Sequence, residues 1–345
     1  MSQVFLRDHT TLRLGGPAGH FIQAETESDL VAAVQHADEA GEPVLVLAGG
    51  SNLVVADEGF PGTVVHVVTR GMTADLDDCD TLASCGGVTV TVAAGESWDD
   101  FVRHCVEHGW VGVEALSGIP GSVGATPVQN VGAYGQEVAD TIASVRTWDR
   151  VDRCQRTFAV GDCGFGYRTS RFKADPARYL VLTVTFQLKQ GTLSAPIRYA
   201  ELARSLGVDH LGRAPLQEVR DAVLGLRSGK GMVLDGSDHD TWSAGSFFTN
   251  PLLPAEEVPE GAPAWPQPDG TVKTSAAWLI ERAGFAKGYG NERASVSTKH
   301  TLALTNRGVA RTEDLLALAR EVAAGVHAAF GIRLTPEPQL INCEL

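Results

Sequence analysis

A long glycine-rich loop is the feature that most restricts what this chain can fold into. Glycines stand at positions 118, 121 and 124 of Ser117-Gly-Ile-Pro-Gly-Ser-Val-Gly-Ala-Thr126. Their spacing is G-x-x-G-x-x-G and therefore differs from the G-x-G-x-x-G fingerprint of dinucleotide-binding domains. The stretch contains no Lys or Arg, and a loop of this length without a ligand is uncommon. We therefore expect its backbone N–H groups to wrap a ligand such as a pyrophosphate.

The composition is that of an ordinary globular protein. Of 345 residues, 43% are hydrophobic and 20% are charged, which excludes a wholly disordered or fibrous chain. At roughly 150 residues per domain, this length predicts two or three domains. The net charge of −14 argues against a nucleic-acid partner, because phosphate backbones require an excess of basic groups. No apolar run is long enough for a signal peptide or a membrane span, so we expect no membrane insertion.

The cysteines and histidines do not form a metal-binding pattern. The six cysteines contain no C-x-x-C pair, so a zinc or thioredoxin-like site is not expected, and a cytoplasmic protein with reduced thiols is the simplest interpretation. They are Cys79, Cys85, Cys105, Cys154, Cys163 and Cys343. His104 and His108 stand four residues apart, but no Glu completes H-E-x-x-H and we see no third ligand nearby. We favour a solvated helix face there and predict no metal.

Helix and strand patterns alternate along the whole chain, which predicts an α/β or α+β protein. Strands are expected at 44–48, 64–68, 88–92, 143–149 and 179–188. Helices are expected between Thr26 and Gly41, over 98–108 after a Ser97 cap, and over 215–226, 274–283 and 312–330. Residues 251–270 are rich in Pro and acidic residues and are expected to form a surface loop.

Two short motifs each allow a functional and an ordinary interpretation. Gly49-Gly50-Ser51-Asn52 follows a buried-type strand, so it suits a phosphate and an ordinary turn equally well. Arg168 stands among small and aromatic residues, where a planar guanidinium suits a carboxylate. A surface Arg in a turn is the ordinary alternative. The segment 225–231 fails the P-loop pattern, which disfavours nucleotide hydrolysis.

Two further residues raise the same question. Ser246, between Gly245 and two phenylalanines, is a candidate proton donor in a dry pocket or simply a strand serine. Its context is not G-x-S-x-G, so an esterase nucleophile is not expected. Glu337 stands between two prolines, which would hold its backbone rigidly. A solvated loop Glu is the alternative.

In their order and spacing, these motifs resemble the UDP-N-acetylenolpyruvoylglucosamine reductase family, flavoenzymes of bacterial peptidoglycan synthesis. The resemblance runs from about residue 8 to the C-terminus. Its strongest parts are GGSN (49–52), IPGSVGATPVQNVGAYGQE (119–137), FGYRTSRF (165–172), AGSFFTNP (244–251) and LTPEP (334–338). This chain departs from the family at Ala48, at Pro338 and in a longer stretch over 231–243.

The resemblance implies an α+β protein with an FAD-binding fold of the vanillyl-alcohol-oxidase type and a C-terminal α+β substrate domain. It implies two FAD-binding subdomains at 1–70 and 71–230. A substrate-binding domain at 231–332 and a C-terminal strand over 333–345, returning to the flavin region, would follow.

The resemblance also implies roles for individual residues. The catalytic residues would be Arg168 as carboxylate clamp, Ser246 as proton donor and Glu337 as a second stabiliser. The substrate would contact Tyr199, Lys230 and Asn250. The FAD contacts would be Gly49, Gly50, Ser51, Asn52, Leu53, Ser117, Gly118, Ile119, Pro120, Gly121, Gly124, Ala125, Gln129, Asn130, Gly132, Ala133 and Tyr134.

The implied reaction is the reduction of UDP-N-acetylglucosamine enolpyruvate to UDP-N-acetylmuramate, with non-covalent FAD and NADPH as reductant. NADPH and the sugar nucleotide would use one cleft in turn, which explains why no dinucleotide fingerprint is needed. We expect a cytoplasmic monomer, with Arg227 and Lys230 as local cations for the diphosphate. The alternatives are another FAD-dependent oxidoreductase of the same fold and a non-catalytic sugar-nucleotide binder.

Overall fold

The computed structural model describes residues 3–76 and 87–345. The chain divides into two compact units. The sheet unit comprises His20–Gly49 and Gly62–Ser228, and the C-terminal unit comprises Met1–Gly19, Gly50–Pro61 and Gly229–Leu345. Cys79 and Cys85 lie outside the described residues, and the expected division at 70, 230 and 332 stays a prediction.

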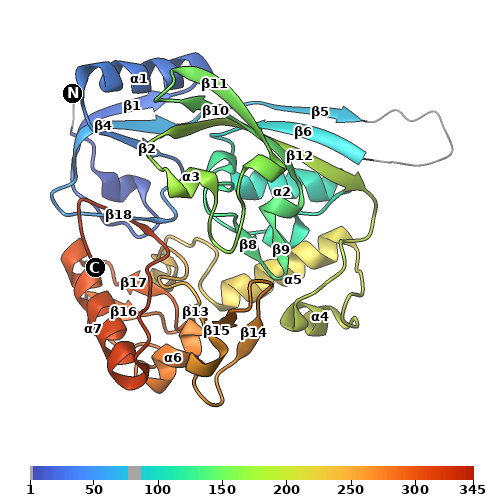
Figure 1. Cartoon of the computed structure of the whole chain (residues 1–345), viewed down its shortest axis with the longest axis vertical. Coiled ribbons are helices and arrows are strands. Elements are labelled where there is room, and N and C mark those ends of the chain that lie inside the picture. The colour runs from blue at the N-terminus through green and yellow to red at the C-terminus, as the bar shows by residue number, and fades with distance from the viewer. Residues whose placement is uncertain (1–2, 77–86) are drawn as a thin grey trace. The chain divides into compact units, whose positions relative to one another are not determined.

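A six-stranded antiparallel sheet forms the centre of the sheet unit (Figure 1). Its strand order is β11-β10-β12-β6-β5, and β7 also pairs with β12. Valines and threonines alternate along β6, so that Val88, Val90 and Val92 are buried in one core. The strands are β5 (Met72–Leu76), β6 (Gly87–Ala93), β7 (Trp110–Val111), β10 (Ile142–Asp149), β11 (Cys154–Ala159) and β12 (Tyr179–Gln190).

A smaller sheet with the order β1-β4-β2 carries helix α1 (Glu27–Ala40) beside it. Its strands are β1 (Ala18–Ala24), β2 (Val44–Leu47) and β4 (Phe60–Val67). The expected ends of α1 are confirmed, because the Thr26 side chain accepts from Asp29 N–H and Gly41 closes the helix with φ 68°. Ion pairs to Glu27 and Asp38 join α1 to arginines of the β10 region.

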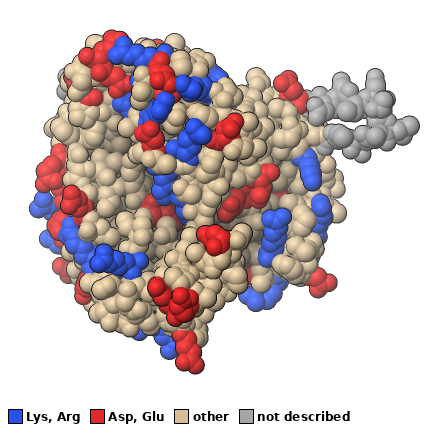
Figure 2. Space-filling model, in the orientation of Figure 1, with Lys and Arg blue, Asp and Glu red and all other residues tan. Residues whose placement is uncertain are grey.

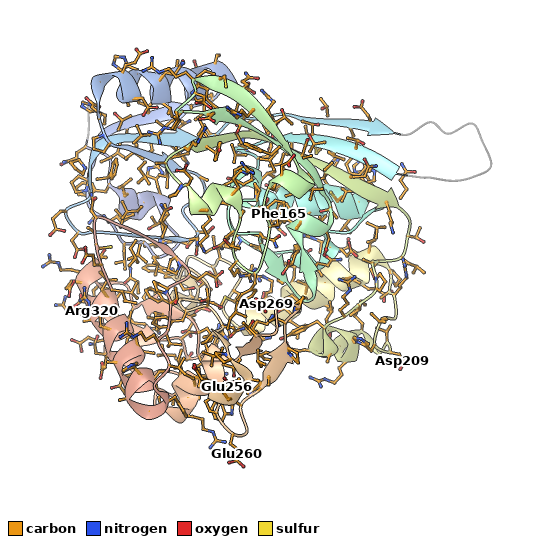
Figure 3. All side chains as sticks on the ribbon, in the orientation of Figure 1. Phe165, Asp209, Glu256, Glu260, Asp269 and Arg320 are labelled. Carbon is orange, nitrogen blue, oxygen red and sulfur yellow. The ribbon has the colours of Figure 1, made fainter. Side chains whose placement is uncertain are left out.

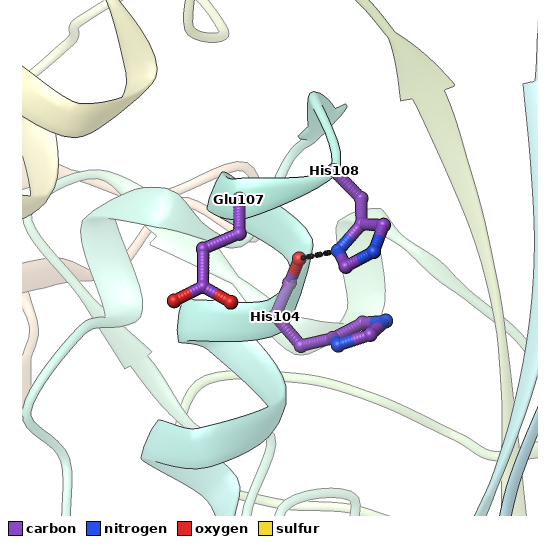
Figure 4. A group of neighbouring side chains, drawn as sticks. All are labelled: His104, Glu107 and His108. Atoms are coloured by element: carbon purple, nitrogen blue, oxygen red, sulfur yellow. Dashed lines mark hydrogen bonds between the residues drawn. The ribbon is translucent and has the colours of Figure 1, made fainter.

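Helix α2 (Trp98–Glu107) lies on the side of the strands opposite α1 (Figure 1). Its Phe101 ring lies 4.8 Å from the Phe186 ring of β12, centroid to centroid. The expectation that no third ligand lies near His104 and His108 is wrong. Glu107 offers one, and ligand atoms of the three residues all lie within 4.8 Å of one another (Figure 4).

The remaining elements of the sheet unit are short, apart from α5. They are η2 (Glu114–Leu116), η3 (Val123–Ala125), β8 (Gly132–Ala133), β9 (Gln136–Glu137), η4 (Val138–Asp140), η5 (Val160–Asp162), α3 (Arg171–Ala174), α4 (Ala200–Leu206) and α5 (Leu216–Gly229). Helix α5 extends three residues beyond its expected end.

The C-terminal unit packs two helices against short strand pairs. One face of α7 (Thr312–Phe330) buries Leu315, Ala319, Val322 and Val326 against α6 (Ala276–Arg282) and the strands. The other elements are η1 (Leu6–His9), β3 (Leu53–Val55), η6 (His239–Thr241), β13 (Leu252–Leu253), η7 (Ala255–Glu257), β14 (Ala264–Pro266), β15 (Val272–Thr274), β16 (Ala294–Val296), β17 (Leu304–Asn306) and β18 (Gln339–Ile341).

The segment 251–270 is not purely a loop, because β13 and β14 both pair with β15. It does lie at the surface. All three residues of β14 are exposed, and Figure 3 shows Glu260 at the outer edge of the molecule. Strands β13 and β14 are only two and three residues long, which is too short to show the hydrophobic alternation that identifies a strand.

Within residues 3–76 and 87–345, no helix is both long and apolar enough to cross a bilayer. Acidic and basic side chains are interspersed on the face shown in Figure 2. The net charge of −14 is therefore not gathered into one acidic region on that face.

Candidate active site

The glycine-rich loop over 117–126 lies against the end of β2 with no side chain in between. A Cβ atom added to Gly49 would lie 2.7 Å from the Cα atom of Gly121, a distance that real Cβ atoms do not show. Gly124 is equally constrained, because its Cβ would lie 2.4 Å from the Cβ atom of Ala94. Glycine at these positions therefore lets two backbone segments meet, as a cradle for a ligand requires.

The first turn of α2 holds this loop at three points. The Trp98 indole Nε1–H donates to Leu116 O at 3.1 Å, and Trp98 N–H donates to Gly121 O at 3.1 Å. Between them, Gly118 N–H donates to an Asp99 carboxylate oxygen at 2.6 Å. The N–H group of Gly118 is thus engaged by protein, so a contact between this residue and a cofactor would have to use other atoms.

Asp99 is itself held by a buried arginine of α5. Arg220 donates from both terminal nitrogens to the two Asp99 oxygens, at 2.7 and 2.8 Å. Burial would raise the pKa of Asp99, but the hydrogen bonds from Arg220 and Gly118 outweigh burial and lower this pKa. The pair Asp99–Arg220 was not apparent from the sequence, because its partners are 121 positions apart.

Ser122 is a second residue that sequence reasoning missed. Its hydroxyl is buried and has no hydrogen-bond partner within the described part of the chain. Buried polar groups are almost always paired, so an orphaned hydroxyl inside this loop fits a ligand with polar groups. The pattern of this loop is defined by its glycines, and Ser122, between Gly121 and Gly124, is not part of that pattern.

Three expected site residues adopt left-handed backbone conformations. Asn130, Tyr134 and Arg168 have φ angles of 47°, 49° and 52°. Only seven non-glycine residues of the described chain have positive φ. Such conformations cost energy and gather at functional sites, so this coincidence supports the expected site.

The Asn130 side chain ties the loop to the segment that carries Arg168. Its Nδ2 group donates to Glu137 Oε2 at 2.8 Å and to Gly166 O at 3.1 Å. Its Oδ1 atom accepts from Ala139 N–H at 3.2 Å. These bonds occupy the amide, so any flavin contact by Asn130 would use its backbone.

The Arg168 guanidinium is half-buried and oriented by backbone carbonyls. Nη2 donates to Gly132 O at 2.7 Å, and Nη1 approaches Asn130 O at 3.4 Å. A guanidinium has five N–H donors in a planar fork. Such a planar group suits a carboxylate, and the two carbonyl contacts fix its orientation.

A buried glutamate, also missed, joins the start of the loop to a neighbouring segment. Glu114 is fully buried and accepts from Gly112 N–H at 2.6 Å, Ala195 N–H at 2.7 Å and Gln136 Nε2–H at 3.0 Å. No motif surrounds Glu114 in the sequence, so nothing there singled it out. Beyond Ala195, the exposed Tyr199 ring meets the Tyr134 ring edge-on at 5.4 Å.

Both expected cations are half-buried, and one of them has a lowered pKa. Burial lowers the pKa of Arg227 to about 10, although the nearby Tyr134 and Asp99 raise it. Arg227 is still protonated at neutral pH and supplies positive charge near Tyr134 in a chain of net negative charge. Lys230, half-buried, follows the end of α5.

In the C-terminal unit, Ser246, Glu337 and Asn52 come together. Glu337 N–H donates to Phe247 O at 2.8 Å, one residue after Ser246. Asn52 Nδ2–H donates to Glu337 O at 3.3 Å, and Gln339 N–H donates back to Asn52 O at 2.9 Å. Segments almost 300 positions apart in the chain are thus joined by hydrogen bonds.

Buried aromatic rings place the serine. Phe247 and Phe248 are both almost fully buried, and their rings meet edge-on at 5.1 Å. Phe248 also bridges to Pro336, beside Glu337. Ser246 itself is half-buried, so the two rings anchor a serine that stays accessible.

Gly50, Leu53 and Asn250 have structural partners as well. A Cβ atom on Gly50 would lie 1.9 Å from His9 O, so glycine is needed there for packing. Leu53 begins β3 and pairs with Gln339, and the Asn250 Oδ1 atom accepts from Ala276 N–H at 2.9 Å. The other expected cofactor residues lie in the segments 49–53 and 117–134: Ser51, Ser117, Ile119, Pro120, Ala125, Gln129 and Ala133.

Comparisons with known proteins cover both units. Residues 18–157 match the family model described as FAD binding domain. Residues 237–341 match the model described as UDP-N-acetylenolpyruvoylglucosamine reductase, C-terminal domain.

Close relatives carry one name. A UDP-N-acetylenolpyruvoylglucosamine reductase of Cutibacterium acnes is 59% identical over 97% of this chain and 89% of its own length. Its counterpart in Thermobifida fusca is 56% identical over 99% of this chain and 97% of its own length. The crystal structure of the Thermus caldophilus reductase matches 99% of this chain and 98% of its own, with a TM-score of 0.66 and 26% identity. These matches confirm the expected FAD-binding α+β fold.

Proposed function

The chain belongs to the UDP-N-acetylenolpyruvoylglucosamine reductase family, and we propose that Arg168, Ser246 and Glu337 carry out its reaction. The protein is an FAD-dependent oxidoreductase that converts UDP-N-acetylglucosamine enolpyruvate to UDP-N-acetylmuramate. This favours the reductase over another oxidoreductase of the same fold.

The residues of the loop fit FAD. The side-chain-free contact between Gly49 and Gly121 and the orphaned Ser122 hydroxyl provide a cradle with a polar group inside it. When bound, FAD supplies the hydride chemistry, with NADPH as reductant. The backbone of 117–134, together with residues 49–53, would bind and orient the cofactor.

Arg168 is assigned to the substrate carboxylate. Addition of hydride to the terminal vinyl carbon leaves negative charge on the side that carries the carboxylate. A preorganised guanidinium stabilises such charge strongly, because it needs no reorganisation during the reaction. The left-handed backbone and the carbonyl bonds of Arg168 provide that preorganisation.

Ser246 is assigned to the proton. The carbon next to the carboxylate must receive one proton to complete the two-electron reduction, and a positioned hydroxyl can give it. Glu337, in its protonated form, would be a second stabiliser of the enolate charge. The hydrogen bond from Glu337 N–H to the carbonyl of Phe247, the residue after Ser246, is the observation that supports this assignment.

Substitution of Ser246 tests the assignment. S246A should slow reduction of the enolpyruvyl substrate by about 10²–10⁴-fold, while flavin content and flavin reduction by NADPH stay as in wild type. The control is S237A, which removes an exposed hydroxyl bonded to Asp235. Turnover of S246A at the rate of S237A would remove Ser246 from the mechanism.

We also propose that Tyr199, Lys230 and Asn250 contact the sugar nucleotide. A cytoplasmic location is supported by the four described cysteines, which are all free, as in a reducing compartment. The monomeric state stays a prediction.

A further inference from the structure

The end of α2 carries a cluster of metal-ligating groups that the proposed function does not use. His104 lies in the last turn of this helix, Glu107 ends it and His108 caps it. Figure 4 shows the two imidazole rings projecting on the same side. Their centroids lie 3.9 Å apart, with 25° between the ring planes. Residues four apart on a helix share a face, so the stacking follows from the spacing.

The distances suit a shared ion. Ligand atoms of the three residues lie within 4.8 Å of one another. Nitrogen and oxygen ligands bind zinc at about 2.0–2.2 Å, so two ligand atoms on one ion are at most about 4.4 Å apart. Closing the site needs movements of about 1 Å, which rotations of exposed side chains allow.

One ring nitrogen of His108 is held by the backbone. Its Nδ1 atom lies 2.9 Å from His104 O, and because a carbonyl only accepts, Nδ1 carries the proton in this bond. The other ring nitrogen, Nε2, then has the lone pair in neutral His108. Metal-bound histidines typically donate their second N–H to a carbonyl in this manner.

The ring of Trp110 contacts both imidazole rings. Trp110 of β7 is buried, and its ring lies 5.2 Å from that of His104 and 5.3 Å from that of His108.

Glu107 is available without breaking a buried contact. Its Oε1 atom pairs with Arg103 at 3.1 Å, and both side chains are about half exposed. Arg103 also pairs with Asp100 at 3.2 Å. Exposed pairs of this kind contribute little to stability, so Glu107 can turn to an ion while Arg103 keeps a partner.

We propose that His104, Glu107 and His108 form a binding site for a divalent transition-metal ion. Two imidazole nitrogens and one carboxylate oxygen suit Zn²⁺, Ni²⁺ or Cu²⁺ and are a poor set for Mg²⁺, which prefers oxygen ligands alone. Three protein ligands leave a position for water, so the site is open. It shares no residue with the proposed flavin or substrate contacts, and its test is independent of them.

Calorimetric titration of the FAD-loaded protein with ZnCl₂ at pH 7.5 tests the proposal. One Zn²⁺ should bind per chain, and Mg²⁺ should give no heat. H104A and H108A should each weaken Zn²⁺ binding at least about tenfold, and E107Q by a smaller factor. The matched control is H36A, which removes an exposed histidine of α1 and should bind Zn²⁺ as wild type does.

A second measurement guards against misfolded variants. Zn²⁺ should raise the Tm of wild type and H36A but not of H104A or H108A, since an ion that binds the folded state stabilises it. Each variant should keep its flavin absorbance without metal. The proposal would be overturned if wild type did not bind Zn²⁺, or if H104A and H108A bound Zn²⁺ as tightly as wild type does. Unchanged binding by E107Q would remove Glu107 from it.

Discussion

At the scale of single residues, Asp149 shows how a buried charge is made stable. Its side chain is fully buried at the end of β10 and contacts Arg178 at 2.9 Å and Arg156 at 2.9 Å. Burial would raise the pKa of Asp149, but the Arg178 hydrogen bonds and the N–H groups of Asp152 and Val151 hold it at about 2.

Removal of this charge should lower stability in a pH-dependent manner. A depressed pKa stabilises the folded state above the unfolded value of about 3.9, and the contribution disappears as pH falls through the folded value. D149N should therefore lower Tm by at least about 2 °C at pH 7. The difference in Tm between D149N and wild type should become smaller between pH 4 and pH 2. Thermal unfolding across this range measures it.

The neighbouring carboxylate provides the control. Asp152 belongs to the same network, but its side chain is 40% exposed. D152N should therefore change Tm less than D149N at pH 7. Equal losses of Tm in D149N and D152N would contradict this account. A Tm difference between D149N and wild type that stays constant down to pH 2 would also contradict it.

Candidate site residues could be proposed from the sequence where a motif surrounds them. Ser246 and Glu337 stand in short patterns with aromatic or proline neighbours, which single them out, whereas the bond between their segments joins residues far apart in the chain. Ser122 and Glu114 were not predictable, because an orphaned hydroxyl and a buried carboxylate are recognised only from their surroundings. The internal bonds of Asn130 and Gly118 were equally hidden.

At the scale of elements, the first turn of α2 positions the proposed cofactor loop. Trp98 and Asp99 bind the loop at Leu116, Gly118 and Gly121. Arg220 extends this clamp to α5. Gly118 and Gly121 lie outside the helices and strands, so the conformation of the loop there depends on such contacts.

Loss of the Asp99 charge should therefore weaken FAD binding. D99N leaves Arg220 buried without its full partner and weakens the bond to Gly118 N–H, so the loop loses preorganisation. We expect the FAD dissociation constant to rise at least about tenfold, or about 1.4 kcal/mol. Fluorescence titration of the apoprotein with FAD measures it.

D100N is the matched control on the same helix. Asp100 pairs only with the exposed Arg103 among the ion pairs of the described residues, so D100N should bind FAD as wild type does. If D99N and D100N bind FAD equally well, α2 has no positioning role.

Helices with strong end signals were predicted well, and weak strands were not. Thr26, Ser97 and Gly331 each mark a helix end that the structure confirms. The exposed strand β14 lacks the alternation that identifies a half-buried strand. The order of strands in the six-stranded sheet depends on pairings between distant segments, which one sequence does not reveal.

At the scale of the whole molecule, the two units carry different parts of the proposed chemistry. The cofactor loop and Arg168 belong to the sheet unit, and Ser246 and Glu337 belong to the C-terminal unit. Relatives with the single name UDP-N-acetylenolpyruvoylglucosamine reductase match almost the whole chain, and so both units. The central claim is therefore that the complete chain performs both half-reactions.

Flavin absorbance under anaerobic conditions tests this claim most directly. The purified protein is reduced with just enough NADPH to bleach the flavin, and UDP-N-acetylglucosamine enolpyruvate is then added. The account predicts bleaching followed by return of the oxidised-flavin band, with UDP-N-acetylmuramate as product. Bleaching by NADPH without any return of the band after substrate is added would contradict it.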